Sequence, residues 1–257
     1  MGRGRSGASK GGGGGGAKIA EEEKIESGTY KEFDDLPSGG WTYGGDGEAV
    51  AKFFEENSNV DELISSMDSY TVNAFEDYWA PGHFMSGQQY RGWDGMSKLD
   101  QDLTRAMDRV LDRGELKEGI VVRRLSTAEL VMGAGKRTAT LEELQAMKGR
   151  VVTSKGAMST GAAAQGLTIG SSKEVEYAIK IPGGERSRGS GMWIGDTRIN
   201  GHGTRQREYL INRDTSFKVG DTTYDRKRGV YVVELLYAGL GEHDYGAGGH
   251  GRYRKRR

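Results

Sequence analysis

Gln206 and Glu208 place an amide and a carboxylate close together in the sequence, a combination that could serve a reaction between two substrates. They stand two apart in the segment GHGTRQREYLINRDTSFKV, so on a β-strand an amide and a carboxylate would face the same side. Such a pair could address two reactants at once, one through each group. Another interpretation stays open, because a polar residue two positions before an acid also occurs by chance on solvated strands.

Two upstream segments add a cation and two hydroxyl groups in a fixed order along the chain. Arg123 lies in GIVVRRLS, and Ser159 and Thr160 lie in KGAMSTG. Taken singly, each has an ordinary interpretation, since Arg123, like its neighbour Arg124, fits a cation at a strand edge. The two hydroxyl residues also fit a strand edge, and Glu208 fits a solvated carboxylate. The order of the three segments is therefore what indicates a site.

In this order, the arginine, the Ser-Thr pair and the Gln-x-Glu segment resemble the ADP-ribosyltransferase family. More narrowly, they resemble its toxin-type branch, defined by Arg, Ser-Thr-Ser and Glu. QREYLINRDTSFKV is similar to the third motif, and LEELQAMKGRV, VEYAIKIPGG and YTVNAFEDYW are similar to flanking phrases. The resemblance covers roughly residues 60–237. The chain departs from the motifs at Val122, Ala157 and Gly161, which replace an aromatic residue, a phenylalanine and a serine.

The resemblance implies NAD as a substrate and a role for each of the polar residues. No metal is expected, because the histidines show no ligand spacing and the chain has no Cys. Glu208 would stabilise an oxocarbenium-like ribose as nicotinamide leaves, and Ser159 would hold Glu208 in its orientation. Arg123 would bind the pyrophosphate through paired guanidinium donors. Thr160 would belong to the NAD site with Ser159 and Glu208, and Gln206 would contact the acceptor.

The implied function is NAD-dependent mono-ADP-ribosyl transfer to a macromolecule, with NAD glycohydrolase activity when no acceptor is present. Gln206, in place of a glutamate, implies an Asn or Gln side chain or a guanine base as acceptor, and a protein is favoured over a nucleic acid. The protein would act in the cytoplasm of its producer or be delivered to a target cell. The alternative is a non-catalytic binding or structural module on the same scaffold, phage- or mobile-element-associated, with tails that bind nucleic acid or other subunits.

Helical patterns precede strand patterns, which predicts an α+β fold with N-terminal helices packed on a mixed two-sheet β core of the ADP-ribosyltransferase type. Helices are predicted over 49–56, 59–67, 70–79, 96–111 and 140–149. The second has an Asn59–Glu62 capping box, the fourth an apolar stripe that includes Leu99, and the last a Thr140–Glu143 capping box. Strands are predicted over 120–124, 151–154, 175–181, 208–211, 216–219 and 230–236.

Composition limits the remaining possibilities. The 257 residues contain 43 Gly and no Cys, which excludes disulfides and thiolate zinc sites. The formal net charge of +0 argues against a globally basic nucleic-acid binder. We expect a Gly-rich basic disordered tail at 1–18, a partly ordered extension at 19–58, a catalytic domain at 59–237 and a flexible Gly/Arg-rich tail at 238–257. No apolar run is long enough to span a bilayer, and no apolar signal-peptide core begins the chain, so a soluble protein is expected.

Overall fold

The computed structural model describes residues 30–33, 47–79, 89, 92–162, 167–168, 174–195 and 208–246. Gln206, the predicted tail at 1–18 and residues 247–257 of the predicted second tail lie outside the described residues. The helices are α1 (Gly47–Asn57), α2 (Val60–Ser65), α3 (Ser69–Trp79), α5 (Lys98–Leu111), α6 (Glu129–Met132) and α7 (Leu141–Gln145), with 3₁₀ turns η1 (Trp93–Gly95) and η2 (Gly184–Ser187). The strands are β1 (Ile120–Ser126), β2 (Val151–Ser154), β3 (Met158–Gly161), β4 (Leu167–Thr168), β5 (Val175–Ile181), β6 (Gly191–Trp193), β7 (Glu208–Ile211), β8 (Thr215–Asp225) and β9 (Val230–Leu240).

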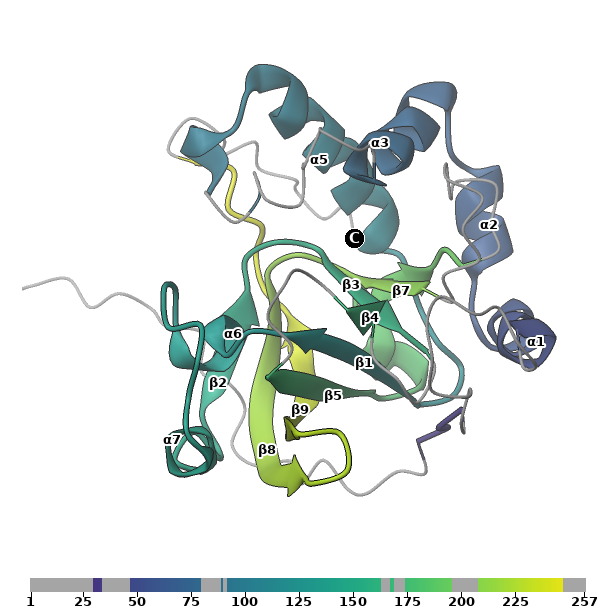
Figure 1. Cartoon of the computed structure of the whole chain (residues 1–257). Coiled ribbons are helices and arrows are strands. Elements are labelled where there is room, and N and C mark those ends of the chain that lie inside the picture. The colour runs from purple at the N-terminus through teal and green to yellow at the C-terminus, as the bar shows by residue number, and fades with distance from the viewer. Residues whose placement is uncertain are drawn as a thin grey trace, which may run out of the picture.

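The predicted α+β class is confirmed, with helices α1 to α5 preceding a mixed sheet (Figure 1). The strand order is β2-β8-β9-β5-β1-β3-β7-β6, and β4 pairs with β1 off this path. β5 and β9 are parallel, as are β1 and β4, whereas the other pairs are antiparallel. β1 and β3 pair at Arg123↔Gly161, which joins β2, β8, β9, β5 and β1 to β3, β7 and β6 in one described sheet.

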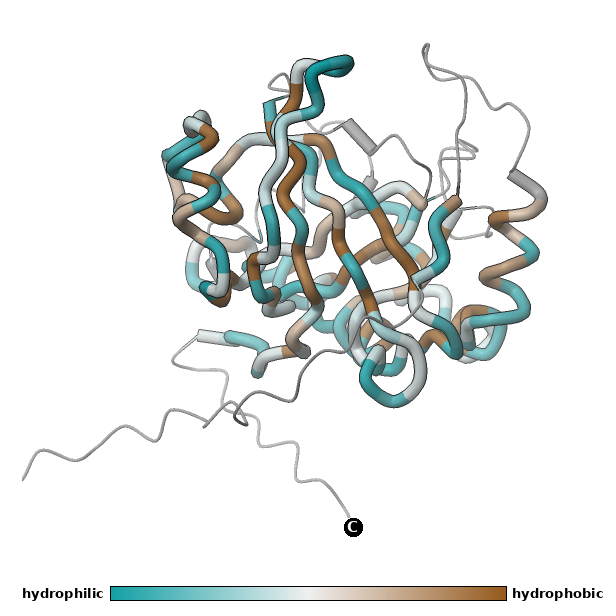
Figure 2. Tube along the Cα trace, turned by 90° about the horizontal axis from the view of Figure 1, so that it is seen from below, coloured by the Kyte–Doolittle hydropathy of each residue, from teal (hydrophilic) through white to brown (hydrophobic). Residues whose placement is uncertain are grey.

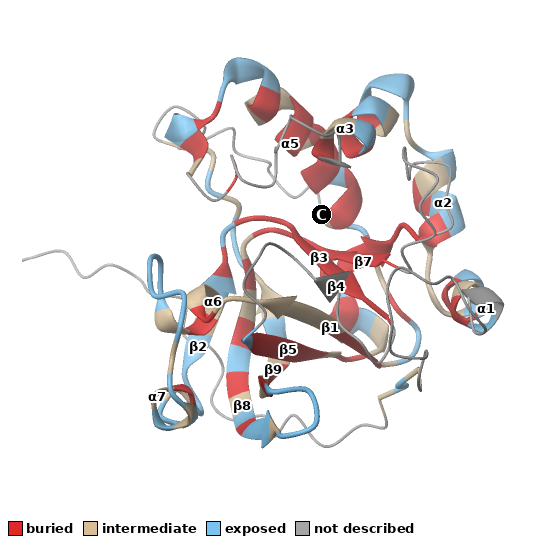
Figure 3. Ribbon diagram, viewed as in Figure 1, coloured by how far each residue is buried: buried red, intermediate tan, exposed pale blue. Residues whose placement is uncertain are grey.

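The strands follow the burial that their sequences predict. β8 alternates buried and more exposed positions along its first half, with Phe217 and Val219 inside and Lys218 outside. Figure 2 shows the same alternation of apolar and polar positions along the long strands. β5, with the sequence VEYAIKI, lies between β1 and β9 and is buried at six of its seven positions. β3 and β7 lie beneath α3 and α5 (Figure 3).

Helix α1 contributes to the main hydrophobic core although the sequence assigns it to the 19–58 extension. Phe54 is fully buried, with its ring stacked on Trp193 of β6 at a centroid distance of 4.3 Å. The same ring stacks on Tyr209 of β7 at 5.8 Å. A single side chain from α1 therefore covers a residue on each of two neighbouring strands.

Two predicted helix starts have different outcomes. The Thr140–Glu143 capping box is confirmed, with both reciprocal hydrogen bonds at the start of α7. The Asn59–Glu62 box is wrong, since Asn59 precedes α2 but caps no backbone group of that helix within the described chain. Its amide instead bridges the turn after α5, donating to the Arg113 carbonyl and accepting from the Glu115 N–H.

The apolar stripe of α5 is confirmed except at its first turn. Leu103, Met107, Val110 and Leu111 are buried, but Leu99 is 56% exposed. The first turn of α5 lies at the end of the helix farther from the described sheet (Figure 1).

Residues 241–246 follow β9 and contact α5, so the described part of the predicted 238–257 tail belongs to the fold. His243 lies between two carboxylates, with Nε2 2.8 Å from Asp112 and Nδ1 3.1 Å from Asp214. Tyr245 donates its hydroxyl hydrogen bond to Asp108 at 2.9 Å. These contacts fasten the segment to α5 and to the turn between β7 and β8.

The segment should make folding stability depend on pH. Burial alone would lower the pKa of His243, but hydrogen bonds with Asp112 and Asp214 and the charge of Asp108 outweigh burial and raise the pKa to about 9. Because the folded pKa lies above the unfolded value of about 6.5, the stabilisation is complete below about pH 6.5 and is lost as pH rises through about 9.

We therefore expect the free energy of unfolding to fall by about 1–3 kcal/mol between about pH 7 and pH 10. His243→Gln should remove most of this dependence. Urea unfolding of both proteins across that range is the measurement. Parallel stability curves for the two proteins would contradict the assignment to His243.

Candidate functional site

Strands β1, β3 and β7 are neighbours, and together they carry the described members of the predicted site. In register, Arg123 of β1 faces Gly161 of β3, and Gly161 faces Glu208 of β7. Ser159 and Thr160 lie two positions and one position before Gly161 on the same strand. Residues 35 or more apart in sequence thus converge, as the order of the three motifs predicts.

Glu208 is a carboxyl group withdrawn from water. It is 2% exposed, and its Oε1 has no hydrogen-bond partner among the described residues. Burial raises its pKa well above the usual value, while a hydrogen bond with the Ser159 side chain and the charge of Arg124 oppose that rise. A buried carboxyl oxygen without a partner is costly, which is typical of a site that a ligand completes.

Ser159 is held on both its side chain and its main chain. It is 4% exposed, and the β3–β7 register puts its side chain diagonally next to that of Glu208 on the same face of the sheet. Hydrogen bonding from Ser159 there lowers the pKa of Glu208, against the effect of burial. Its carbonyl oxygen accepts a hydrogen bond from Nη1 of Arg124 at 3.2 Å. The Ser159–Glu208 contact is therefore the part of the predicted site that the described structure brings together directly.

Thr160 has a different environment from Ser159. Its side chain is fully buried, and its hydroxyl donates to the Tyr209 carbonyl at 2.6 Å. The Tyr209 hydroxyl in turn shares a 2.8 Å hydrogen bond with Ser190. The hydroxyl of Thr160 thus ties β3 to β7 beside Glu208, and it is already engaged in that contact.

The two adjacent arginines of β1 have different partners, as neighbouring strand residues point to opposite faces. Arg123 is ion-paired with Glu176 at 3.2 Å and with Glu32 at 3.3 Å. Glu176 is buried, and it also receives Arg228 at 2.6 Å. Arg124 is the arginine that contacts Ser159 and whose charge favours the ionised form of Glu208.

The sequence analysis gave Arg124 and Glu176 no role in the site, although the sequence contains an indication of each. The doublet Arg123-Arg124 offers two cations, and one motif position cannot decide between them. Glu176 interrupts the otherwise apolar start of VEYAIKI, and a carboxylate in a buried strand requires a paired cation. That pairing is what engages Arg123.

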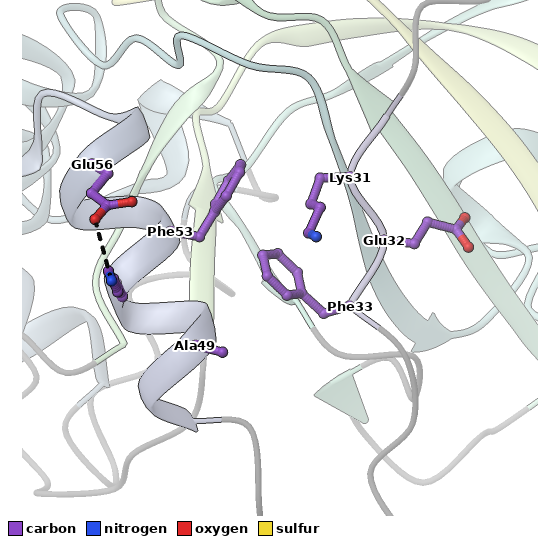
Figure 4. A pocket seen from close by; sticks show the side chains of 7 residues that line it. Lys31, Glu32, Phe33, Ala49, Phe53 and Glu56 are labelled. Carbon is purple, nitrogen blue, oxygen red and sulfur yellow. Dashed lines mark ion pairs between the residues drawn. The ribbon is translucent and has the colours of Figure 1, made fainter.

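A surface pocket of about 420 Å³ lies between helix α1 and residues 31–33, which run beside the start of β1 through the Lys31↔Ile120 bridge (Figure 4). Phe33 and Phe53 line it with their rings edge to face at 5.2 Å. Its charged residues already have neighbours, because Glu32 pairs with Arg123 and Lys52 with Glu56. Of the predicted catalytic residues that the structure describes, Ser159 and Glu208, neither lines this pocket.

Two further findings concern the described residues alone. They contain no group of three or more His, Cys, Asp or Glu side chains arranged to hold a metal ion. Within the same part of the chain, every helix is too short or too polar to cross a membrane.

Solved structures with the same fold are ADP-ribosylating toxins. C3stau2 from S. aureus, solved with NAD, has 15% identity and a TM-score of 0.57, over 81% of this chain and 98% of that chain. Plx2a, an ADP-ribosyltransferase toxin from Paenibacillus larvae, has 16% identity and a TM-score of 0.59, over 74% and 94%. The Clostridium limosum C3 exoenzyme has 13% identity and a TM-score of 0.58, over 81% and 97%. The fold is thus that of the toxin-type ADP-ribosyltransferases.

The sequence places the chain in the same class. A family model described as ADP-ribosyltransferase exoenzyme matches residues 88–237, so the chain belongs to that family. The match includes β1, β3 and β7, the strands that carry the candidate site. No curated protein matches the chain in sequence.

Proposed function

We propose that this protein cleaves NAD and transfers ADP-ribose to a macromolecular acceptor, releasing nicotinamide. The observation that carries the proposal is the buried Glu208 carboxyl group, which is held by Ser159 and has an Oε1 without a partner among the described residues. An acceptor oxygen in such a place suits the ribose of NAD, which offers hydroxyl donors and develops positive charge.

The chemistry needs stabilisation of a cation more than proton transfer to the leaving group. As the glycosidic bond breaks, its electron pair stays on the nicotinamide nitrogen, which becomes neutral, so no general acid is required. The ribose becomes oxocarbenium-like, and Glu208 would accept a hydrogen bond from the 2′-hydroxyl and oppose the positive charge. An acceptor nucleophile then bonds to the same ribose carbon and loses its proton to solvent.

The acceptor is proposed to be a protein side chain amide, Asn or Gln. The support is Gln206, which lies outside the described residues and carries an amide where a glutamate would orient a guanidinium. Water would replace the acceptor when none is bound, giving NAD glycohydrolysis. Delivery to a target cell would fit the toxin-type family.

The pyrophosphate contact can be tested with the arginine doublet. The motif assigns pyrophosphate binding to Arg123. The ion pairs favour Arg124 for this role, because Arg123 is already paired with two carboxylates. We expect Arg124→Gln to raise KM for NAD about 10- to 100-fold, the size expected for a lost charge-assisted contact. Arg123→Gln should change KM less. Nicotinamide release at varied NAD concentration measures both, and a larger effect at Arg123 would restore the motif assignment.

Nicotinamide release from NAD by the purified protein, with Glu208→Ala alongside, tests the proposed function. Release that requires Glu208, together with transfer of label from NAD to a protein acceptor, would support it. A folded protein that neither binds nor cleaves NAD would overturn it, and the binding-module hypothesis would then be the better one.

A further inference from the structure

Ala157 immediately precedes β3, and both of its backbone polar groups are bound by side chains from the helical layer. Its carbonyl oxygen accepts a hydrogen bond from the Tyr78 hydroxyl at 2.9 Å. Its N–H donates to Oε1 of Gln89 at 2.8 Å. Tyr78 lies on α3, 79 residues away in sequence, and Gln89 lies 68 residues away.

Both anchoring side chains are fixed in their surroundings. Tyr78 and Gln89 are each 4% exposed. The amide nitrogen of Gln89 lies 3.4 Å from the hydroxyl of Thr104, a fully buried residue of α5. The anchor therefore reaches from α5 through Gln89 to the start of β3, and from α3 through Tyr78 to the same residue.

The anchor lies one residue before the point where β3 enters the described sheet. The pairing between β3 and β7 begins at Met158↔Ile211, one residue after Ala157. Ala157 also lacks the bulky side chain that could lock this position by packing. Two hydrogen bonds to buried side chains thus take the place of both a sheet ladder and a large side chain.

We propose that Tyr78 and Gln89 are positioning residues that, through the backbone of Ala157, keep the Ser159 hydroxyl on Glu208. Ser159 is two residues beyond the anchor, so a shift of Ala157 carries it along the strand and away from Glu208. The catalytic meaning of the contact rests on the proposed function, but the contact itself is measurable without NAD.

The carboxyl group of Glu208 reports on this geometry. Ser159 and Arg124 are the described neighbours that favour its ionised form, against the effect of burial. Tyr78→Phe removes one hydroxyl and changes no charge. A change in the pKa of Glu208 in that variant must therefore pass through the position of β3.

The experiment is a ¹³C-carboxyl NMR titration of the NAD-free protein, with the Glu208 signal assigned from its loss in Glu208→Gln. We expect Tyr78→Phe to raise the pKa of Glu208 by about 0.5–1 unit, because the Ser159 hydrogen bond weakens. Gln89→Leu should raise it too, and it serves as the second variant if Tyr78→Phe does not fold.

Tyr237→Phe is the matched control. Tyr237 is also a buried tyrosine whose hydroxyl donates to a main-chain carbonyl, that of Arg188 at 3.2 Å, but it lies on β9. Its loss should leave the pKa of Glu208 unchanged. An unchanged pKa in folded Tyr78→Phe, or an equal rise in Tyr237→Phe, would overturn the proposal.

Nicotinamide release by the same proteins distinguishes the positioning role of Tyr78 from the proposed function. If the unchanged protein cleaves NAD, Tyr78→Phe should lower kcat about 5- to 10-fold and move the acid limb of the pH profile upward, with little change in KM. If the unchanged protein is inactive but the pKa of Glu208 still rises in Tyr78→Phe, the positioning role stands and the proposed function fails.

Discussion

Glu208→Gln is expected to lower nicotinamide release from NAD about 10²–10³-fold, the loss typical of one preorganised electrostatic group, while the protein stays folded. Glutamine keeps the shape and a hydrogen-bond acceptor but cannot carry the negative charge that opposes the oxocarbenium-like ribose. Because Ser159 can still donate to the amide oxygen, the variant isolates the effect of charge from that of position.

The same variant should gain stability at neutral pH. Burial raises the pKa of Glu208 well above its unfolded value, so its contribution to stability is complete below the unfolded pKa and is lost as pH rises through the folded one. Glutamine does not ionise and avoids that loss. The stability difference between Glu208→Gln and the unchanged protein should therefore increase with pH.

Thermal unfolding and nicotinamide release, measured on the same preparations, would check both effects. Glu185→Gln, at an exposed position in η2, is the matched control and should change neither quantity. Activity retained in Glu208→Gln would refute the role of the carboxylate charge. A destabilised Glu208→Gln protein would contradict the account of the buried carboxyl group.

Arg213→Met is expected to lower the free energy of unfolding by about 3–5 kcal/mol, as is typical when one partner of a buried ion pair is removed. Three hydrogen bonds of 2.9–3.1 Å join the guanidinium to Asp108, and the side chains are 6% and 3% exposed. Burial raises the pKa of Asp108, and Arg213 opposes that rise. Without Arg213, the buried Asp108 carboxyl group would lose its guanidinium partner and keep the Tyr245 hydroxyl and the more distant His243.

Urea unfolding of Arg213→Met measures the loss of stability, and two further variants test its cause. Lys148→Met breaks an exposed pair with Asp221 and should cost less than about 1 kcal/mol. Arg213→Met combined with Asp108→Leu should recover much of the loss, because no unpaired charge remains. An Arg213→Met protein no less stable than Lys148→Met would show that the buried pair does not stabilise the fold.

Local patterns in the sequence predicted the elements well because their causes are local. The strands at 151–154, 175–181 and 208–211 have the predicted bounds, and the Thr140–Glu143 box caps its helix. Each depends on a periodicity or a spacing of three to seven residues, which the sequence displays directly.

Local patterns could not predict which residues far apart in the sequence contact each other. The amide of Asn59 prefers the turn at 113–115 over its own helix, and Glu176 pairs with Arg123 across the sheet. Both outcomes depend on contacts more than 50 residues apart. The convergence of Ser159 with Glu208 was predictable only because a family motif already encodes such a distant contact.

Because Phe54 packs on both Trp193 and Tyr209, the smallest part of the chain that can fold by itself should include helix α1. A chain shortened to begin at residue 59 would keep every strand of the candidate site but would uncover two large aromatic rings. Exposed apolar surface of that kind promotes self-association. The solubility of the strands that carry the candidate site thus depends on a helix that carries none of the proposed catalytic groups.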